Sequence, residues 1–109
     1  TPLVDVYAFG VVLYELLTGV KPIAGETVER IFNAILYEPL NLEPVKALNA
    51  PPAVFDLITR CTAKQTAQRP QSMTEVVVAL QHILDPSMPA PKWTAENAAA
   101  PPAQPQQPV

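Results

Sequence analysis

The sequence predicts an all-α unit followed by a disordered tail. Residues 5–19 are apolar on every side of a helical wheel, whereas residues 26–37 and 72–84 carry apolar side chains at the spacing of a one-sided helix. No stretch has a convincing strand pattern. In residues 86–109 proline, alanine and glutamine dominate, and such a segment cannot bury enough apolar surface to offset the entropy of ordering it. We therefore expect a helical domain over residues 1–85 and a linker or tail after it.

The first predicted helix runs from about residue 3 to residue 18. Thr1 and Pro2 suit its N-cap and first position, and Gly19 suits its C-terminal end. A helix that is apolar all round is buried in protein or in a membrane, and this one is shorter than the roughly 20 apolar residues that a bilayer requires. We therefore expect protein to wrap it on all sides. A unit of this size buries only roughly 60% of its unfolded surface, so we expect a fragment of a larger domain, or a chain covered by self-association or by another chain.

The second predicted helix covers residues 26–37 and has one apolar face. Thr27 is its expected N-cap. Prolines 39 and 44 predict that residues 38–49 form an open loop. The apolar residues of the helix are Val28, Ile31, Phe32, Ile35 and Leu36.

Two more helices are predicted at residues 53–62 and 72–84. The first begins after Pro51-Pro52 and carries its apolar residues on one face. In the second, Ser72 and Glu75 fit a capping box, in which each side chain accepts the other residue's backbone N–H. The apolar residues expected to face inward are Val54, Leu57, Ile58 and Cys61 in the first helix, and Met73, Val76, Val77, Leu80, Ile83 and Leu84 in the second.

Charge and composition exclude several functions. The net charge of -3 leaves no basic patch, which argues against a nucleic-acid partner. The single cysteine, Cys61, excludes an internal disulfide and a cysteine-based metal site, and its apolar surroundings predict a small core residue. His82, the only histidine, has no second imidazole or cysteine nearby and is predicted to lie on the surface. No segment of this chain is long and apolar enough to cross a membrane.

Two motifs resemble one known family. The stretch DVYAFGVVLYELLTG at residues 5–19, followed by Lys21-Pro22-Ile23, resembles the central helix of the C-terminal lobe of eukaryotic-like serine/threonine protein kinases. About fifty residues later, QRPQSMTEVV at residues 68–77 resembles the last helix of that lobe and the turn before it. The resemblance covers residues 1–84 and only the last third of a kinase domain, so it implies the helical C-lobe portion of a protein-kinase-like fold.

The resemblance implies an enzyme that transfers the γ-phosphoryl group of ATP to hydroxyl groups of protein substrates. The Gly-rich loop, the strand lysine, the catalytic aspartate and the metal-binding aspartate of such kinases would lie upstream of Thr1. The chain itself therefore supplies no catalytic, cofactor-binding or metal-binding residue. ATP and Mg²⁺ are expected for the intact domain, and the 109-residue chain alone is expected to be inactive.

The same resemblance implies supporting roles for five residues. Asp5 would accept backbone amides of the catalytic loop, in addition to the local amide that its place in the first helical turn suggests. Arg69 would form a buried ion pair with an upstream glutamate. Val12 and Leu16, one turn apart, would support the apolar side chains under the adenine ring, and Glu15 would line the peptide-substrate groove or be only structural.

The sequence departs from the family pattern just before Arg69. Lys64, Gln65 and Thr66 occupy positions where lysine, aspartate and proline are usual, so we expect a less rigid turn there. Trp93 stands alone in the tail, either in a solvated spacer or packed onto the helical unit.

Three functional readings remain open. They are an active serine/threonine kinase with a tyrosine-kinase-like variant, a pseudokinase or helical protein-interaction scaffold, and an unrelated small helical binding module. We expect a cytoplasmic location for this region, with any membrane anchor outside it, and the low lysine content suggests a bacterial source.

Overall fold

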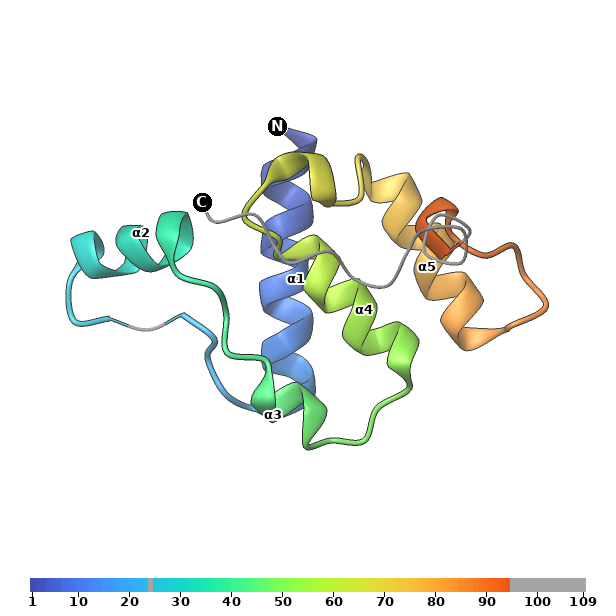
Figure 1. Cartoon of the computed structure of the whole chain (residues 1–109), viewed down its shortest axis with the longest axis horizontal. Coiled ribbons are helices and arrows are strands. Elements are labelled where there is room, and N and C mark those ends of the chain that lie inside the picture. Colours follow the sequence, from blue (N-terminus) through green and yellow to red (C-terminus); the bar gives the residue numbers. More distant parts are fainter. Residues whose placement is uncertain (24, 95–109) are drawn as a thin grey trace, which may run out of the picture.

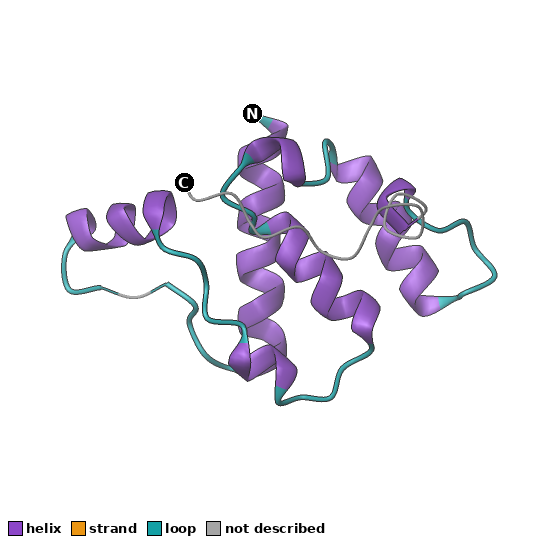
Figure 2. Ribbon diagram, in the orientation of Figure 1, coloured by secondary structure: helices purple, strands orange, loops and turns teal. Residues whose placement is uncertain are grey.

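The structure, a computed structural model, describes residues 1–23 and 25–94. Over these residues the chain consists of helices and loops without a strand, so the all-α prediction is confirmed (Figures 1 and 2). The predicted disordered segment from residue 95 onward lies outside the described residues. The elements are α1 (Pro2–Thr18), α2 (Val28–Tyr37), α3 (Glu43–Lys46), α4 (Pro52–Cys61), the 3₁₀ turn η1 (Thr66–Gln68) and α5 (Met73–Leu84).

The predicted ends of α1 are confirmed. The Thr1 hydroxyl accepts the backbone N–H of Val4 at 3.4 Å, which satisfies one of the free amides of the first turn. At the other end Gly19 adopts φ 71°, and its N–H donates to the Glu15 carbonyl at 2.8 Å. This left-handed conformation strongly favours glycine, so the sequence indicates where the helix stops.

The N-caps of α2 and α5 are also confirmed, with one difference. The Thr27 hydroxyl accepts the N–H of Arg30, and the Ser72 hydroxyl accepts the N–H of Glu75 at 3.3 Å. The Glu75 carboxylate accepts the N–H of Gln71 at 3.1 Å, one residue before the N–H of Ser72 that a regular capping box would use. The Ser72 half of the predicted box is therefore correct, and the Glu75 half is displaced by one residue.

The core lies where α1, α4 and α5 meet. In Figure 1, α1 runs through the centre of the molecule and α4 crosses it, with α5 on one side and α3 at its C-terminal end. The apolar face predicted for α4 is confirmed, and Cys61 is fully buried on it. The central cluster consists of Val6, Leu57, Cys61, Val76, Ala79 and Trp93, and a second cluster near α3 consists of Tyr14, Val45 and Ile58.

Helix α1 is only partly covered by residues 1–23 and 25–94, which agrees with the expectation that its full covering needs a larger domain or another chain. Its buried residues, Val6, Tyr7, Gly10 and Tyr14, form one face. On other faces Val12 is 50% exposed and Leu16 is 76% exposed. The other elements are too few to cover a second side of a helix that is apolar all round.

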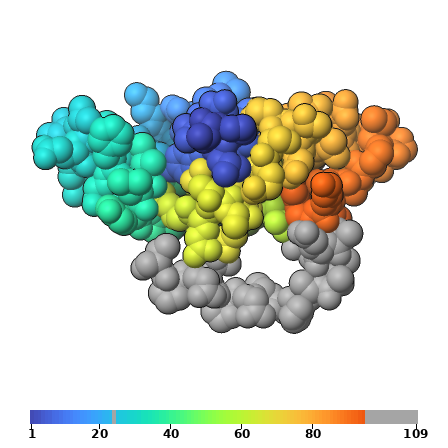
Figure 3. Space-filling model, turned by 90° about the horizontal axis from the view of Figure 1, so that it is seen from above, coloured from blue at the N-terminus to red at the C-terminus, as the bar shows by residue number. Residues whose placement is uncertain are grey.

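Two predictions are wrong in detail, and one helix that was predicted to be amphipathic leaves its apolar face exposed. Residues 38–49 are not an open loop throughout, because Pro44 occupies the first turn of α3, where a proline is tolerated. The apolar face of α2 is not buried, and Figure 3 shows this segment (cyan) at one end of the molecule. In α5 fewer residues face the core than predicted. The predicted inward residues that are exposed there are Met73, Val77 and Leu84.

The turn between α4 and α5 is closed by hydrogen bonds, although it lacks the usual aspartate and proline. Its η1 segment is held by the N–H of Gln68, which donates to the Gln65 carbonyl at 3.0 Å. The Gln71 side-chain amide donates to the carbonyls of Thr66 and Arg69 at 3.0 and 2.6 Å. The Gln71 side chain thus supplies hydrogen bonds in a turn that lacks the usual aspartate and proline, and the lower rigidity expected for this turn stays a prediction.

The chain after α5 returns to the core. Trp93 is only 7% exposed and belongs to the central cluster. Of the two alternatives for Trp93, packing onto the helical unit is therefore the correct one. The expected disordered linker does not begin at residue 86, because apolar burial orders the chain as far as Trp93.

Candidate functional site

The residues expected to support a nucleotide site lie on the uncovered side of α1. Val12 and Leu16 are one turn apart, and both are largely exposed. Glu15, which precedes Leu16 in the sequence, is partly buried. The structure therefore places Val12 and Leu16 together on one exposed apolar face, and none of the elements formed by residues 1–23 and 25–94 covers it.

Asp5 lies in the first turn of α1 and is exposed. Its side chain accepts no hydrogen bond from residues 1–23 or 25–94, so the expected bond to a local amide is absent there. The Thr1 hydroxyl makes that bond instead, to Val4. The Asp5 carboxylate therefore remains open to donors from outside the described residues.

Arg69 connects the turn before α5 to the start of α1 through hydrogen bonds. Its Nε donates to the Ala63 carbonyl at 2.8 Å, and Nη1 donates to the Leu3 carbonyl at 3.0 Å. The guanidinium also lies 4.9 Å from the centre of the Tyr7 ring. No carboxylate is within ion-pair distance of Arg69 in the part of the chain that the structure describes, so its predicted acidic partner is not among these residues.

Lys64 joins α2 to the rest of the molecule, a role that sequence reasoning did not foresee. Its ammonium group donates to the carbonyls of Ala34 and Ile35 at 3.1 and 2.7 Å, in the last turn of α2. The Ile35 carbonyl has no helical partner because residue 39 is a proline, and the Ala34 carbonyl also accepts the N–H of Glu38. Both carbonyls lie at the negative end of the helix dipole. A lysine close to a helix end in space leaves no local sequence signal, because Lys64 and Ile35 are 29 positions apart.

Tyr7 lies close to both cations, Lys64 and Arg69. The Lys64 ammonium is 5.5 Å and the Arg69 guanidinium 4.9 Å from the centre of its ring, so the cations interact with the π-system. Burial raises the pKa of the Tyr7 hydroxyl, and the Arg69 charge lowers it in part. Burial and then the Arg69 charge lower the pKa of Lys64, while Glu38 raises it. This cluster holds α1, α2 and the turn before α5 together.

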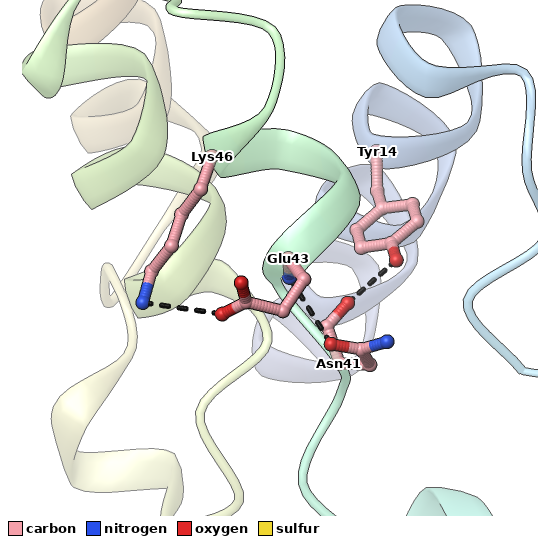
Figure 4. Close-up of polar contacts among 4 residues, drawn as sticks. All are labelled: Tyr14, Asn41, Glu43 and Lys46. Atoms are coloured by element: carbon pink, nitrogen blue, oxygen red, sulfur yellow. Dashed lines mark hydrogen bonds and ion pairs between the residues drawn. The ribbon is translucent and has the colours of Figure 1, made fainter.

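A second polar contact fixes the other end of α1. The Tyr14 hydroxyl, on a side chain that is 1% exposed, donates to the Asn41 carbonyl at 2.6 Å. The Asn41 side chain accepts the N–H of Glu43 at 3.1 Å at the start of α3, and Lys46 pairs with Glu43 at 3.4 Å (Figure 4). Burial raises the pKa of Tyr14, so its hydroxyl stays protonated as a donor at neutral pH.

The described residues do not fit a nucleotide–metal centre. No group of three or more His, Cys, Asp or Glu side chains in residues 1–23 and 25–94 is placed to hold a metal ion. The same residues include no helix with both the length and the apolar character needed to traverse a bilayer. The expected supporting roles of Asp5, Arg69, Val12, Leu16 and Glu15 would therefore require groups outside the described residues.

Comparison with known proteins identifies the family. A family model described as protein tyrosine and serine/threonine kinase matches residues 1–80. The chain belongs to the protein kinase family. The matched region includes α1, α2, α4 and most of α5, so these helices are the helical C-lobe portion of a kinase domain.

Several kinases are similar to the chain. The LRR receptor-like serine/threonine-protein kinase ER1 of Oryza sativa subsp. japonica is 37% identical over 106 residues, which are 89% of this chain and 10% of that protein. The serine/threonine-protein kinase mos of Patiria pectinifera is 35% identical over 82 residues, 74% of this chain and 22% of that protein. The serine/threonine-protein kinase PkaA of Streptomyces coelicolor is 35% identical over 72 residues, 66% of this chain and 12% of that protein.

These relatives come from a plant, an animal and a bacterium, so they do not single out the bacterial source that we expected. The chain spans between 10% and 22% of the length of these kinases. No solved structure matches the chain.

Proposed function

We propose that this chain is the C-terminal part of the catalytic domain of a serine/threonine kinase. The complete enzyme would transfer the γ-phosphoryl group of ATP to a serine or threonine hydroxyl of a protein, releasing ADP. The observation that carries the proposal is the match of residues 1–80 to the kinase family. The kinases named above, which are similar over most of this chain, support serine or threonine as the acceptor.

The uncovered residues suggest how this part would serve the reaction. The open Asp5 carboxylate would accept backbone amides of the catalytic loop and so position the catalytic base. The exposed Val12 and Leu16 side chains would carry the apolar residues under the adenine ring, and Glu15 would face the peptide groove. Arg69 would pair with a glutamate outside this chain, in addition to its bonds to Leu3 and Ala63. The chain alone would transfer no phosphate, and the enzyme would act in the cytoplasm.

Phosphate transfer from labelled ATP tests the proposal. The reading frame around this chain would be expressed as a complete protein and supplied with Mg²⁺ and protein substrates, beside the purified 109-residue chain. We expect labelled phosphoserine or phosphothreonine from the complete protein and none from the chain. Exclusive phosphotyrosine would contradict the serine/threonine assignment, and no transfer by the folded, ATP-binding protein would contradict the enzymatic function.

Asp5 and Arg69 are tested in the same protein. Asp5→Asn should lower kcat by roughly 10-fold or more with little change in the KM for ATP, because it disturbs the catalytic loop and not nucleotide binding. Arg69→Lys keeps the charge but not the forked geometry, so it should lower the melting temperature. The matched control is Lys46→Arg, at a side chain that is 59% exposed. An Asp5→Asn enzyme with wild-type kcat would remove the proposed role.

A second candidate, a protein-interaction scaffold without activity, is favoured by one observation. Helix α2 buries none of its residues, although its predicted apolar face includes Val28, Phe32 and Leu36, which are 66%, 59% and 60% exposed. An exposed apolar patch of this kind is typical of a protein-interaction surface. The phosphate-transfer assay separates the two candidates, because a scaffold would bind proteins without labelling them.

A further inference from the structure

The segment after α5 is bent back by a set of local hydrogen bonds. Asp85 accepts the N–H and the hydroxyl of Ser87 at 3.0 and 2.7 Å, and the N–H of Met88 donates to the Asp85 carbonyl at 2.9 Å. The Met88 carbonyl lies 2.7 Å from Nδ1 of His82, which must carry the proton because a carbonyl only accepts. Four contacts thus reverse the chain at the end of α5 and direct it toward the core (Figure 1).

The returning chain delivers a large aromatic side chain to the core. Trp93 is 7% exposed, and Pro91 is also buried. A tryptophan buries on the order of 150–250 Å², more than any aliphatic residue around it. The buried cluster that includes Trp93 draws its other members from three helices: Val6 of α1, Leu57 and Cys61 of α4, and Val76 and Ala79 of α5.

A cation lies over the same ring. The Arg60 guanidinium is 5.3 Å from the centre of the Trp93 ring, and its Nε donates to Asp56 at 3.1 Å. The ion pair between Arg60 and Asp56 orients the guanidinium from one turn of α4. Tryptophan is the aromatic residue that binds cations best. The site therefore offers an indole both apolar contacts and a guanidinium group over its ring.

The site lies beyond the region that defines the family in this chain. The family match ends at residue 80, whereas the docked segment covers residues 86–94. A cavity of about 260 Å³ continues beside the indole, between Asp56, His82 and Pro91. The groove between α4 and α5 is therefore larger than the side chain that occupies it.

We propose that residues 86–94 are a strap that closes the domain, and that the groove between α4 and α5 is a binding site for an indole side chain, supplied here by Trp93. The strap replaces a missing piece of core on the side where α4 and α5 would otherwise expose apolar surface. The folded unit consequently extends at least to Thr94 and does not end at residue 85. This inference is independent of the proposed kinase activity.

Trp93 is the only tryptophan of the chain, so fluorescence reports on the strap directly. Acrylamide quenching of the 109-residue chain is compared with that of N-acetyl-tryptophanamide and of the chain in urea. We expect a blue-shifted emission and a quenching constant several-fold below both references. Quenching equal to that of the free indole compound would overturn the inference.

Substitution provides the second test. Trp93→Ala should lower the melting temperature by roughly 10–20 °C, because Trp→Ala substitutions in cores are among the most costly in a small domain. Lys92→Ala, next to it in the strap but exposed, should change it by less than about 3 °C. Equal melting temperatures for the two variants would contradict the proposal. If Trp93→Ala does not fold, Trp93→Phe, which keeps an aromatic ring, should fold and have a melting temperature below that of wild type.

Rescue by a free ligand tests the binding site itself. Millimolar indole should raise the melting temperature of Trp93→Ala, or restore helical circular dichroism if that variant is unfolded, because a ligand that binds only the folded state stabilises it. Wild type, in which the Trp93 side chain already occupies the indole position, should respond by less than about 1 °C. Truncation after Asp85 should respond to indole as Trp93→Ala does, and truncation after Thr94 should behave as wild type. Absence of rescue in both indole-free variants would refute the indole site.

Discussion

Gly10 of α1 packs directly against Cys61 of α4 in the core. A β-carbon on residue 10 would stand 2.7 Å from the Cys61 β-carbon and 2.7 Å from Cγ2 of Thr62. Atoms of real side chains do not approach so closely, so the two helices can lie at this distance only because residue 10 has no side chain. This contact sets how deeply the rest of α4 is packed against α1.

Gly10→Ala should therefore destabilise the chain although alanine favours a helix. Overpacking costs about 1–3 kcal/mol, and the better helix propensity of alanine returns up to about 1 kcal/mol. We expect the free energy of unfolding, measured in urea, to fall by about 1–2 kcal/mol. Val4→Ala, at a position 60% exposed on the same helix, should change it by less than about 0.5 kcal/mol. A Gly10→Ala chain as stable as wild type would show that the helices are farther apart.

The Cys61 thiol should be unreactive in the folded chain. It is fully buried, and burial raises its pKa to about 12. The thiolate is the reactive species, so alkylation by iodoacetamide at pH 8 should be at least about 100-fold slower than in urea. Mass spectrometry of the labelled chain measures both rates. Fast labelling without denaturant would contradict the buried position.

The free energy of unfolding should fall in alkaline solution because the buried Cys61 thiol ionises there. The pKa of Cys61 is 9.0 in the reference state and about 12 in the folded chain, so folding favours the protonated thiol. Its contribution is complete below pH 9 and is lost as the pH rises toward 12, at up to about 1.4 kcal/mol per pH unit. Burial also raises the pKa of Tyr14, which adds a loss above pH 10.

Urea unfolding of wild type and Cys61→Ala at pH 8, 9 and 10 measures this effect. Cys61→Ala retains the tyrosines but lacks the thiol, so its stability should decline less between pH 9 and 10. Parallel declines in the two chains would assign the alkaline loss to other groups.

Lys64→Met should loosen α2 while leaving the core intact. The substitution removes the ammonium that donates to the Ala34 and Ile35 carbonyls, and hydrogen bonds from charged donors contribute roughly 1.5–3 kcal/mol. Because α2 buries no residue of its own, little else holds it. Hydrogen exchange at α2 amides should accelerate by about 10-fold or more, with α4 amides unchanged. Lys46→Met, at a side chain 59% exposed, is the control, and equal exchange in the two variants would contradict the anchoring role.

Most of the helices could be predicted from the sequence because their signals are local. Thr1, Thr27 and Ser72 accept amides within three residues, and Gly19 ends α1 through its own backbone conformation. Apolar spacing alone likewise indicated the buried face of α4. The family could be recognised for a similar reason, since its two motifs are short contiguous stretches within residues 1–80.

The tertiary structure decided which apolar faces are buried. The pattern of α1 predicts burial on all sides, but only the sides that α3, α4 and α5 reach are covered, and Leu16 stays exposed. The contacts of Lys64 and Trp93 could likewise be identified only from the tertiary structure, because they join positions that are far apart in the chain. Apolar and capping patterns specify what a segment can bury or bond. Which of its side chains are buried depends on the other segments that pack against it, and a local sequence pattern does not specify those segments.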